Sequence, residues 1–211
     1  NANRISSAKA FAASTTYRLK YKGWTFTPGI RYENISLQRE NFGGSDPSRT
    51  GDNLSTRENN VEVFIPGVGT NYNFNNNFSI FGGIHKGFSP PSNQAGQKPE
   101  ASINYELGSR FGVGKLRGET VFFFNDYSNL LGSDLAATGG TGTLDQFNAG
   151  EVDVNGLELL LNYDFSNQES TIKIPFTLGY TFTNTEFKNS FGSDEDLWGE
   201  VTSGDELHYL S

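Results

Sequence analysis

Few residues in this sequence carry side chains that could perform covalent chemistry. Cysteine is absent, which excludes disulfides, thiolate metal ligands and a cysteine nucleophile together. The only histidines are His85 and His208, and a serine such as Ser89 or Ser92 would need one of them within hydrogen-bonding reach to act as a nucleophile. No spacing marks such a pair, so we expect no enzyme and assign no catalytic residue.

Two short segments have the composition of a ligand site but not its spacing. The acidic run Asp194, Glu195 and Asp196 offers oxygen ligands for Ca²⁺, yet it lacks the intervals of a known calcium loop. The stretch "TGGTGT" (Thr138 to Thr143) is rich in glycine, but no helix follows it to present amides to a phosphate. We expect a hydrated loop at the acidic run and a flexible loop at the glycine-rich stretch, and we predict neither a metal nor a cofactor.

Composition narrows the class of protein and its partners. The 211 residues include 16 Lys and Arg against 24 Asp and Glu, and the formal net charge of -8 argues against a nucleic-acid partner. Mean hydropathy is low at -0.51, whereas aromatic residues reach 14%. Low hydropathy with many aromatics, glycines and asparagine-rich turns is typical of an all-β chain rather than of disorder. No apolar run approaches the ~18 residues of a membrane helix, so any membrane crossing would use strands.

Alternation at period two predicts long strands with one apolar and one polar face. In "IKIPFTLGYTF" (Ile172 to Phe182) every second residue is a large apolar one, and the residues between them are small or polar. Similar runs predict about eight strands in all. They begin with Lys9 to Tyr21, Trp24 to Glu33, Val61 to Phe74 and Phe78 to Phe88, and continue with Ile103 to Phe111, Leu116 to Leu131, Leu157 to Phe165 and Ile172 to Phe182.

Short turns and long loops alternate between these strands. The short polar connectors are "KYKGW", "NNN", "GVGK" and "SNQES". The longer Gly-, Ser-, Asp- and Asn-rich segments are predicted to be loops at roughly Arg39 to Asn60, Ser89 to Ala101, Gly132 to Ala149, and from Asn189 onward. Tight turns at one end and long loops at the other are typical of a transmembrane barrel.

Strand length and the distribution of charge favour an apolar face in lipid over an apolar face in a soluble core. Many runs exceed ten residues, whereas soluble strands usually have ~5 to 6 and a tilted membrane strand needs ~9 to 11. Full charges such as Arg31, Glu106, Arg110 and Glu158 lie on the polar face, which suits a wet lumen. A soluble β-sandwich with one solvated face remains the alternative.

Several longer strings resemble TonB-dependent outer-membrane receptors, and most closely those of the iron(III) dicitrate type. They occur in the expected order over nearly the whole chain: "TFTPGIRYENI" (Thr25 to Ile35), "FSIFGGIHKGFSPPSNQ" (Phe78 to Gln94), "KPEASINYELGSRF" (Lys98 to Phe111), "VFFFNDYSNLL" (Val121 to Leu131), "NAGEVDVNGLELLLNYDF" (Asn148 to Phe165) and "GDELHYLS" (Gly204 to Ser211). His208 stands where relatives usually have a proline.

The resemblance implies an antiparallel transmembrane β-barrel of about 22 strands closed by a plug. Residues 1–211 would form a partial barrel domain, without the plug and without the closing strands. The parent would lie in the outer membrane of a Gram-negative bacterium, contact its lipid, and couple to TonB through the plug region. It would import ferric citrate or a related ferric siderophore.

Ferric citrate is an anion, so cationic and amide side chains near the outer ends of strands are the natural ligands. The candidates by position are Arg39, Arg49, Arg57, Lys86, Gln94 and Lys98. Two alternatives stay open: a barrel that takes up another nutrient, such as a glycan or cobalamin, and a surface-binding barrel that transports nothing.

Strands cut from a larger barrel would have two unpaired edges, which invite pairing with other chains. We therefore expect that this chain alone either closes into a smaller barrel or associates with copies of itself.

Overall fold

The computed structural model describes residues 3–91, 97–133, 146–148, 150–166, 172–192 and 200–207. These residues form strands joined by turns and loops, as the alternation predicts. None of the described residues belongs to a helix that is long and apolar enough to cross a membrane. The strands are β1 (Arg4–Thr16), β2 (Leu19–Tyr21), β3 (Trp24–Asn41), β4 (Ser55–Asn75), β5 (Phe78–Ser89), β6 (Glu100–Val113), β7 (Leu116–Ser128), β8 (Leu131–Ser133), β9 (Gln146–Asn148), β10 (Val152–Asp164), β11 (Pro175–Phe187), β12 (Phe191–Gly192) and β13 (Glu200–Val201).

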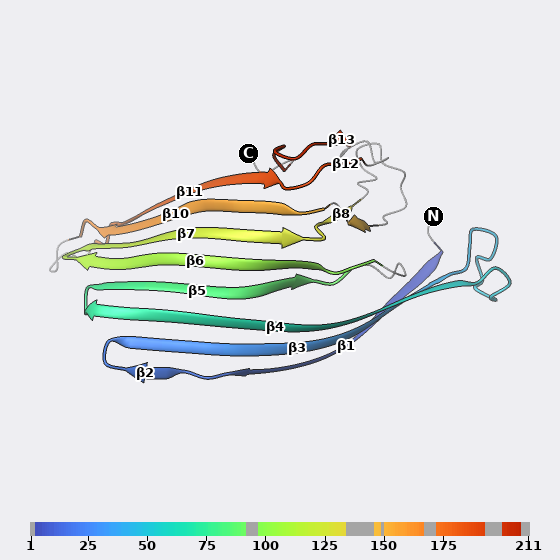
Figure 1. Ribbon diagram of the computed structural model, residues 1–211, viewed down its shortest axis with the longest axis horizontal. Coiled ribbons are helices and arrows are strands. Elements are labelled where there is room, and N and C mark those ends of the chain that lie inside the picture. The colour runs from blue at the N-terminus through green and yellow to red at the C-terminus, as the bar shows by residue number, and fades with distance from the viewer. Residues whose placement is uncertain are drawn as a thin grey trace.

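One antiparallel sheet of nine strands makes up the architecture (Figure 1). Its order is β1-β3-β4-β5-β6-β7-β10-β11, and β2 continues the line of β1 by pairing with β3. The pairs β8-β9 and β12-β13 form two small sheets beside it. Within the described ranges no second large sheet packs against the first, so the sandwich alternative is wrong.

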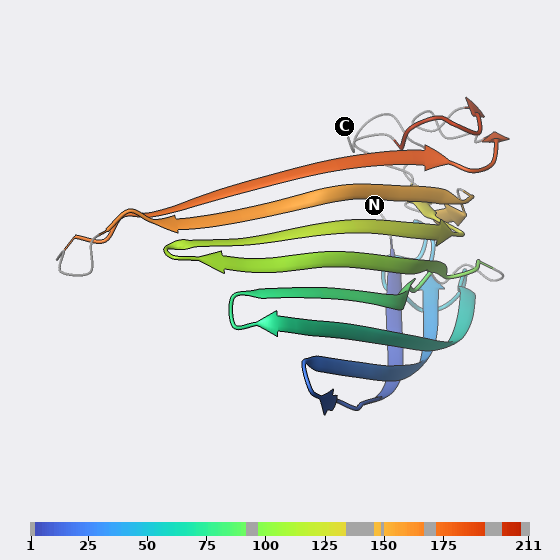
Figure 2. The ribbon, with the colours of Figure 1, turned by 60° about the vertical axis from the view of Figure 1, so that its left-hand side comes forward.

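The sheet is curved but open. The loop-end parts of β3 and β4 bend out of the plane of the later strands (Figure 2). Strands β1 and β11 lie at opposite edges of the pairing order, and no described segment joins them. The expected closure into a smaller barrel is therefore wrong for the single chain, whereas association with copies stays a prediction.

The two ends of the sheet differ. Residues 22–23, 76–77 and 114–115 make tight turns at one end, which we call the tight-turn end. Longer connections, among them residues 42–54 between β3 and β4, lie at the other end, which we call the loop end. The predicted loop Arg39 to Asn60 was too long, because pairing of β3 with β4 continues to Asn41 and Ser55.

Cross-strand partners share a face of the sheet, so the register assigns every side chain to one of two faces. The apolar face is identified by pairs such as Trp24 with Tyr72, and Tyr105 with Phe124. Its large side chains are exposed: Phe11, Trp24, Phe26, Ile30, Phe64, Ile84, Tyr105, Leu107, Phe122, Phe176, Leu178, Tyr180 and Phe182. The opposite, polar face carries pairs such as Arg110 with Glu119. This division agrees with the alternation in the sequence.

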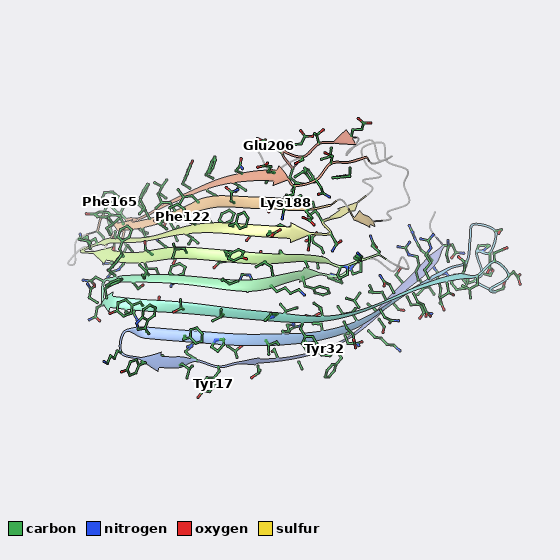
Figure 3. The ribbon with its side chains drawn as sticks, viewed as in Figure 1. Tyr17, Tyr32, Phe122, Phe165, Lys188 and Glu206 are labelled. Carbon is green, nitrogen blue, oxygen red and sulfur yellow. The ribbon has the colours of Figure 1, made fainter. Side chains whose placement is uncertain are left out.

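Aromatic rings concentrate in two bands on the apolar face. The band at the tight-turn end includes Trp24 and Tyr72, whose ring centroids lie 4.7 Å apart. The band nearer the loop end includes Tyr32 and Phe64, at 5.0 Å. Trp24 and Tyr32 are eight residues apart on β3, which is about 26 Å along the strand. Figure 3 shows Tyr17 and Phe165 toward the tight-turn end, with Lys188 and Glu206 at the loop end.

Beyond the second band the two faces exchange character. On the polar face Ile35, Val61 and Val63 become buried, with exposed fractions of 7%, 5% and 6%. A small core of Val152, Phe187 and Val201 forms at the loop end, with Tyr127, Leu130, Val154, Phe191 and Leu207 packed against it. The apolar stripe thus changes sides where the aromatic band ends. The same strands therefore bury apolar residues on the polar face at the loop end. Between the two aromatic bands they expose apolar residues on the apolar face.

Candidate functional site

Two of the predicted cations lie side by side on adjacent strands. Arg39 of β3 is the register partner of Arg57 of β4, and both side chains belong to the polar face. Sequence composition placed both arginines in a loop. In the structure Arg39 lies near the end of β3 and Arg57 near the start of β4, both at the loop end of the sheet. Two guanidinium groups on neighbouring strands offer several N–H donors to one anion.

The segment that precedes β6 reaches the same region. Asn59 lies two residues after Arg57 on β4, and its Nδ2 donates a hydrogen bond to the carbonyl of Gln97 at 3.2 Å. Lys98 follows immediately and is exposed. The segment before β6 thus contacts β4 two residues from Arg57, and Lys98 follows this contact directly; we call Arg39, Arg57 and Lys98 the outer cationic cluster.

Arg49 has a structural role in the loop of residues 42–54. Its Nε donates to Oδ1 of Asn3 at 2.9 Å, and its guanidinium lies 5.7 Å from the centroid of the Phe42 ring. Asn3 in turn donates to the carbonyls of Gly43 and Asp46 at 3.0 and 2.6 Å. The side chain thus fastens the loop to the start of the chain, apart from the outer cationic cluster.

Asp46 organises the same loop. Its carboxylate accepts hydrogen bonds from the backbone N–H groups of Thr50 and Gly51 at 2.9 and 2.8 Å, and the Thr50 hydroxyl donates at 3.2 Å. These donors, Gly51 first, hold the pKa of Asp46 below its usual value. The loop at this end is therefore an ordered structure with its own polar core.

Lys86 lies on the other face of the sheet. Its register partner is Ile103, and it alternates with His85, which faces Gly67 on the polar face. The predicted site residue Lys86 is thus separated from the arginine pair by the sheet itself. Gln94 lies outside the described residues, as do Ser92, the run 194–196, the stretch 138–143 and His208.

The middle of the polar face holds a shallow hollow of about 380 Å³. Gly67, Gly69 and Gly83 line it, together with His85 and Glu106. A Cβ added at Gly69 would have no neighbour within 4 Å. The space above this glycine is therefore open and forms part of the hollow. Ser89 lies four residues from His85 on the same strand, about 13 Å away. This is too far for the hydrogen bond that a nucleophile would need.

Arg110 is held flat against the polar face beside this hollow. Its Nε is paired with Oε2 of Glu119 on the next strand, and its guanidinium lies 4.0 Å from the centroid of the Phe81 ring. Phe81 occupies the space above Gly108, where an added Cβ would meet the ring. The glycine, the aromatic ring and the arginine therefore form one stacked unit.

A charged cluster at the loop end was missed by the sequence reasoning. Lys188 Nζ lies 3.0 Å from Asp126, 3.5 Å from Glu151 and 3.8 Å from Asp153. The hydrogen bond to Asp126 raises the pKa of Lys188, and the neighbouring carboxylates raise it further. Asp126, Asp153 and Glu186 are register partners on three adjacent strands, so the cluster becomes visible only once strand pairing is known. In the described part of the chain no group of three His, Asp or Glu side chains has the geometry of a metal site.

Comparison with known proteins assigns the family. A family model described as the β-barrel of TonB-dependent receptor-like proteins matches residues 1–209. Among solved structures, the unliganded ferric citrate transporter FecA is 21% identical with a TM-score of 0.68, and this chain is covered to 95% and FecA to 29%. The siderophore receptor PiuA from Acinetobacter baumannii is 16% identical with a TM-score of 0.70, with coverage of 95% and 30%.

The ferric yersiniabactin uptake receptor FyuA from Yersinia pestis is 21% identical with a TM-score of 0.64, with coverage of 94% and 30%. The chain thus spans about 30% of the length of these receptors. At these identities the structural likeness concerns the fold alone, whereas the family model covers nearly the whole chain. Receptors of this family are outer-membrane transporters and not enzymes. The sheet described above is an unclosed section of their barrel, and the chain belongs to the TonB-dependent receptor β-barrel family.

Proposed function

We propose that this chain forms part of the wall of a receptor that imports ferric citrate, or a related ferric siderophore, across the outer membrane of a Gram-negative bacterium. Family membership and the fold of the ferric citrate transporter support this reading. The rest of the receptor would supply the plug and, through it, the coupling to TonB.

The apolar face would contact lipid. Its two aromatic bands, about 26 Å apart along β3 before the strand tilt is considered, suit the apolar belt of ~25 Å and the aromatic girdles of outer-membrane barrels. The tight-turn end would face the periplasm and the loop end the exterior, because such barrels have short periplasmic turns and long external loops. The polar face would then line the lumen.

The outer cationic cluster carries the ligand part of the proposal. Arg39 and Arg57 are paired across β3 and β4 on the lumen side of the loop end, and the chain before Lys98 is hydrogen-bonded beside them. Planar guanidinium groups bind carboxylates with two N–H donors each, and a ferric citrate complex presents several carboxylates.

Uptake by an iron-starved receptor knockout tests this proposal. We expect the wild-type gene to restore growth on ferric citrate, and Arg57→Gln to weaken ferric citrate binding about tenfold, the cost of one charge-assisted hydrogen bond. Lys86→Gln is the control, because this cation lies on the opposite face of the sheet, level with Pro66 and so nine residues from Arg57 along β4. Equal effects of the two substitutions would contradict the assignment of the cluster.

Other results of the same assay would favour other functions. Growth restored by a glycan or by cobalamin, with no rescue by ferric citrate, would indicate a different nutrient. Lost adhesion without any change in iron uptake would indicate a surface-binding barrel.

The edge strands β1 and β11 determine how the isolated chain should associate. We infer that further strands cover them in the whole receptor, and that the chain alone associates through them. Light scattering in detergent would test this, and a stable monomer at high concentration would refute it.

A further inference from the structure

A second hollow of about 270 Å³ opens on the polar face at the tight-turn end, far from the outer cationic cluster. Its lining comes from four strands and one turn, and the residues that matter here are Asn73, Asn75, Asn77, Arg110, Gly112 and Arg117. The turn is fixed in place, since Asn77 N–H donates to Asn75 Oδ1 at 2.8 Å and Gly112 N–H donates to the Asn77 carbonyl at 2.7 Å. The hollow therefore has a rigid rim.

Arg117 lies across the floor of this hollow. It is the register partner of Gly112 on β6, and a Cβ added at Gly112 would coincide with the Arg117 guanidinium. The missing side chain at Gly112 is thus what lets the guanidinium cross to the strand that carries Arg110. Because Arg110 and Gly112 are two residues apart on one face, the two arginines approach the hollow from neighbouring positions.

The charge of this hollow is only partly balanced. Glu119 pairs with Arg110, whereas Arg117 is exposed and forms no ion pair within the described part of the chain. Lys20, the partner of Thr25, adds a further cation to the polar face at this end.

We propose that this hollow is a second binding station for an anionic ferric chelate, used after the chelate has passed the plug and before it enters the periplasm. The inference rests on the proposed function, and it adds a site that acts in release rather than in capture. The unbalanced guanidinium of Arg117 and the amide groups of the three asparagines suit carboxylate oxygens. A hollow below the ~300 to 1,000 Å³ of strong ligand sites suits brief occupancy.

Substitutions of Arg117 in the whole receptor test the station, with ⁵⁵Fe-labelled ferric citrate as the probe. Binding is measured on de-energised cells and the initial uptake rate on energised cells, each normalised to the amount of folded receptor. For Arg117→Gln we expect binding within about twofold of wild type and uptake about tenfold slower, the loss of one charge-assisted contact. Arg117→Lys keeps the charge and should retain most of the uptake.

Lys22→Gln is the matched control, because Lys22 is an exposed cation at the same end that lies over the Tyr21 ring at 5.2 Å, away from the hollow. It should leave both measurements unchanged. The station is refuted if Arg117→Gln transports at the wild-type rate, if Arg117→Lys is as slow as Arg117→Gln, or if binding falls in proportion to uptake. A wild-type receptor that does not bind ferric citrate at all would instead refute the proposed function, and the station would fall with it.

Discussion

Gly156 should be far less tolerant of a methyl group than Gly179, although both are glycines on the polar face of adjacent strands. Gly156 lies on β10, opposite Thr183 of β11 and Phe123 of β7. A Cβ there would overlap the Phe182 carbonyl oxygen and lie 2.6 Å from Cζ of the Phe123 ring. A Cβ at Gly179 would have no neighbour within 4 Å. Gly156→Ala and Gly179→Ala thus form a matched pair.

The magnitude follows from which neighbour can move. The Phe123 ring can turn away over the open polar face, but the Phe182 carbonyl belongs to the β10-β11 ladder, so relief there requires a shift of the strand. Overpacking of this kind costs about 1 to 3 kcal/mol, and alanine regains about 0.5 to 1 kcal/mol over glycine in a strand. Gly156→Ala should therefore lose up to about 2.5 kcal/mol of unfolding free energy, whereas Gly179→Ala should gain about 0.5 to 1 kcal/mol.

Thermal unfolding of the detergent-solubilised receptor measures the difference, for example by the change in gel mobility when the barrel unfolds. The whole receptors matched here are about three times as long as this chain, so 1 kcal/mol corresponds to less than the roughly 2 to 4 °C in Tm expected for 150 to 250 residues. Gly156→Ala should unfold at a lower temperature than wild type and Gly179→Ala at the same or a higher temperature. Equal Tm values, or a more stable Gly156→Ala, would refute the reasoning from backbone overlap.

Three further substitutions, one of them with a control variant, test other parts of the structure. Leu178→Arg should reduce the amount of folded receptor in the outer membrane, because a cation near the bilayer centre costs about 2 to 4 kcal/mol on the lipid side. Thr181→Arg, on the polar face, should assemble normally. Immunoblots of membranes compare the amounts of the two variants. Asp46→Ala should speed tryptic cleavage after Arg49, since two backbone N–H groups lose their acceptor. Because the folded pKa of Asp46 is lowered, its contribution in wild type is present at neutral pH and is lost as the pH falls below about 4, which amide exchange in the loop would detect. Lys188→Gln should speed amide exchange at the end of β11 by less than about tenfold, as expected of a partly exposed ion pair. Since the folded pKa of Lys188 is raised, exchange in wild type should approach that of the variant only as the pH rises above about 10.5.

Much of the fold could be predicted because a period of two allows few interpretations. In Phe176 to Phe182 the alternate residues are all large and apolar, and the structure exposes them on one face. The strings that resemble TonB-dependent receptors identified the family, and the family model confirms it.

The sequence reasoning failed where the faces exchange character. Polar composition from Arg39 to Asn60 indicated a loop, but β3 and β4 stay paired as far as Asn41 and Ser55. Ile35 and Val61 lie with their apolar side chains on the polar face, where they are buried. Contacts that depend on register, such as Lys188 with Asp126, could not be predicted before the strands were aligned. The face of Lys86 was readable in principle, because it alternates in step with Ile84. The ligand assignments stay predictions.

Unequal strand lengths make the wall uneven in height at the loop end. β4 has 21 residues and β5 has 12, a difference of roughly 30 Å at ~3.3 Å per residue, and the β3-β4 hairpin extends well past its neighbours (Figure 1). Among the described parts of the section, this hairpin is the one that an antibody or a phage would meet first in a cell envelope. A small chelate, in contrast, need not touch the tip of this hairpin. Sequence change in the hairpin tip would then alter recognition by large particles while leaving the route of a small nutrient intact.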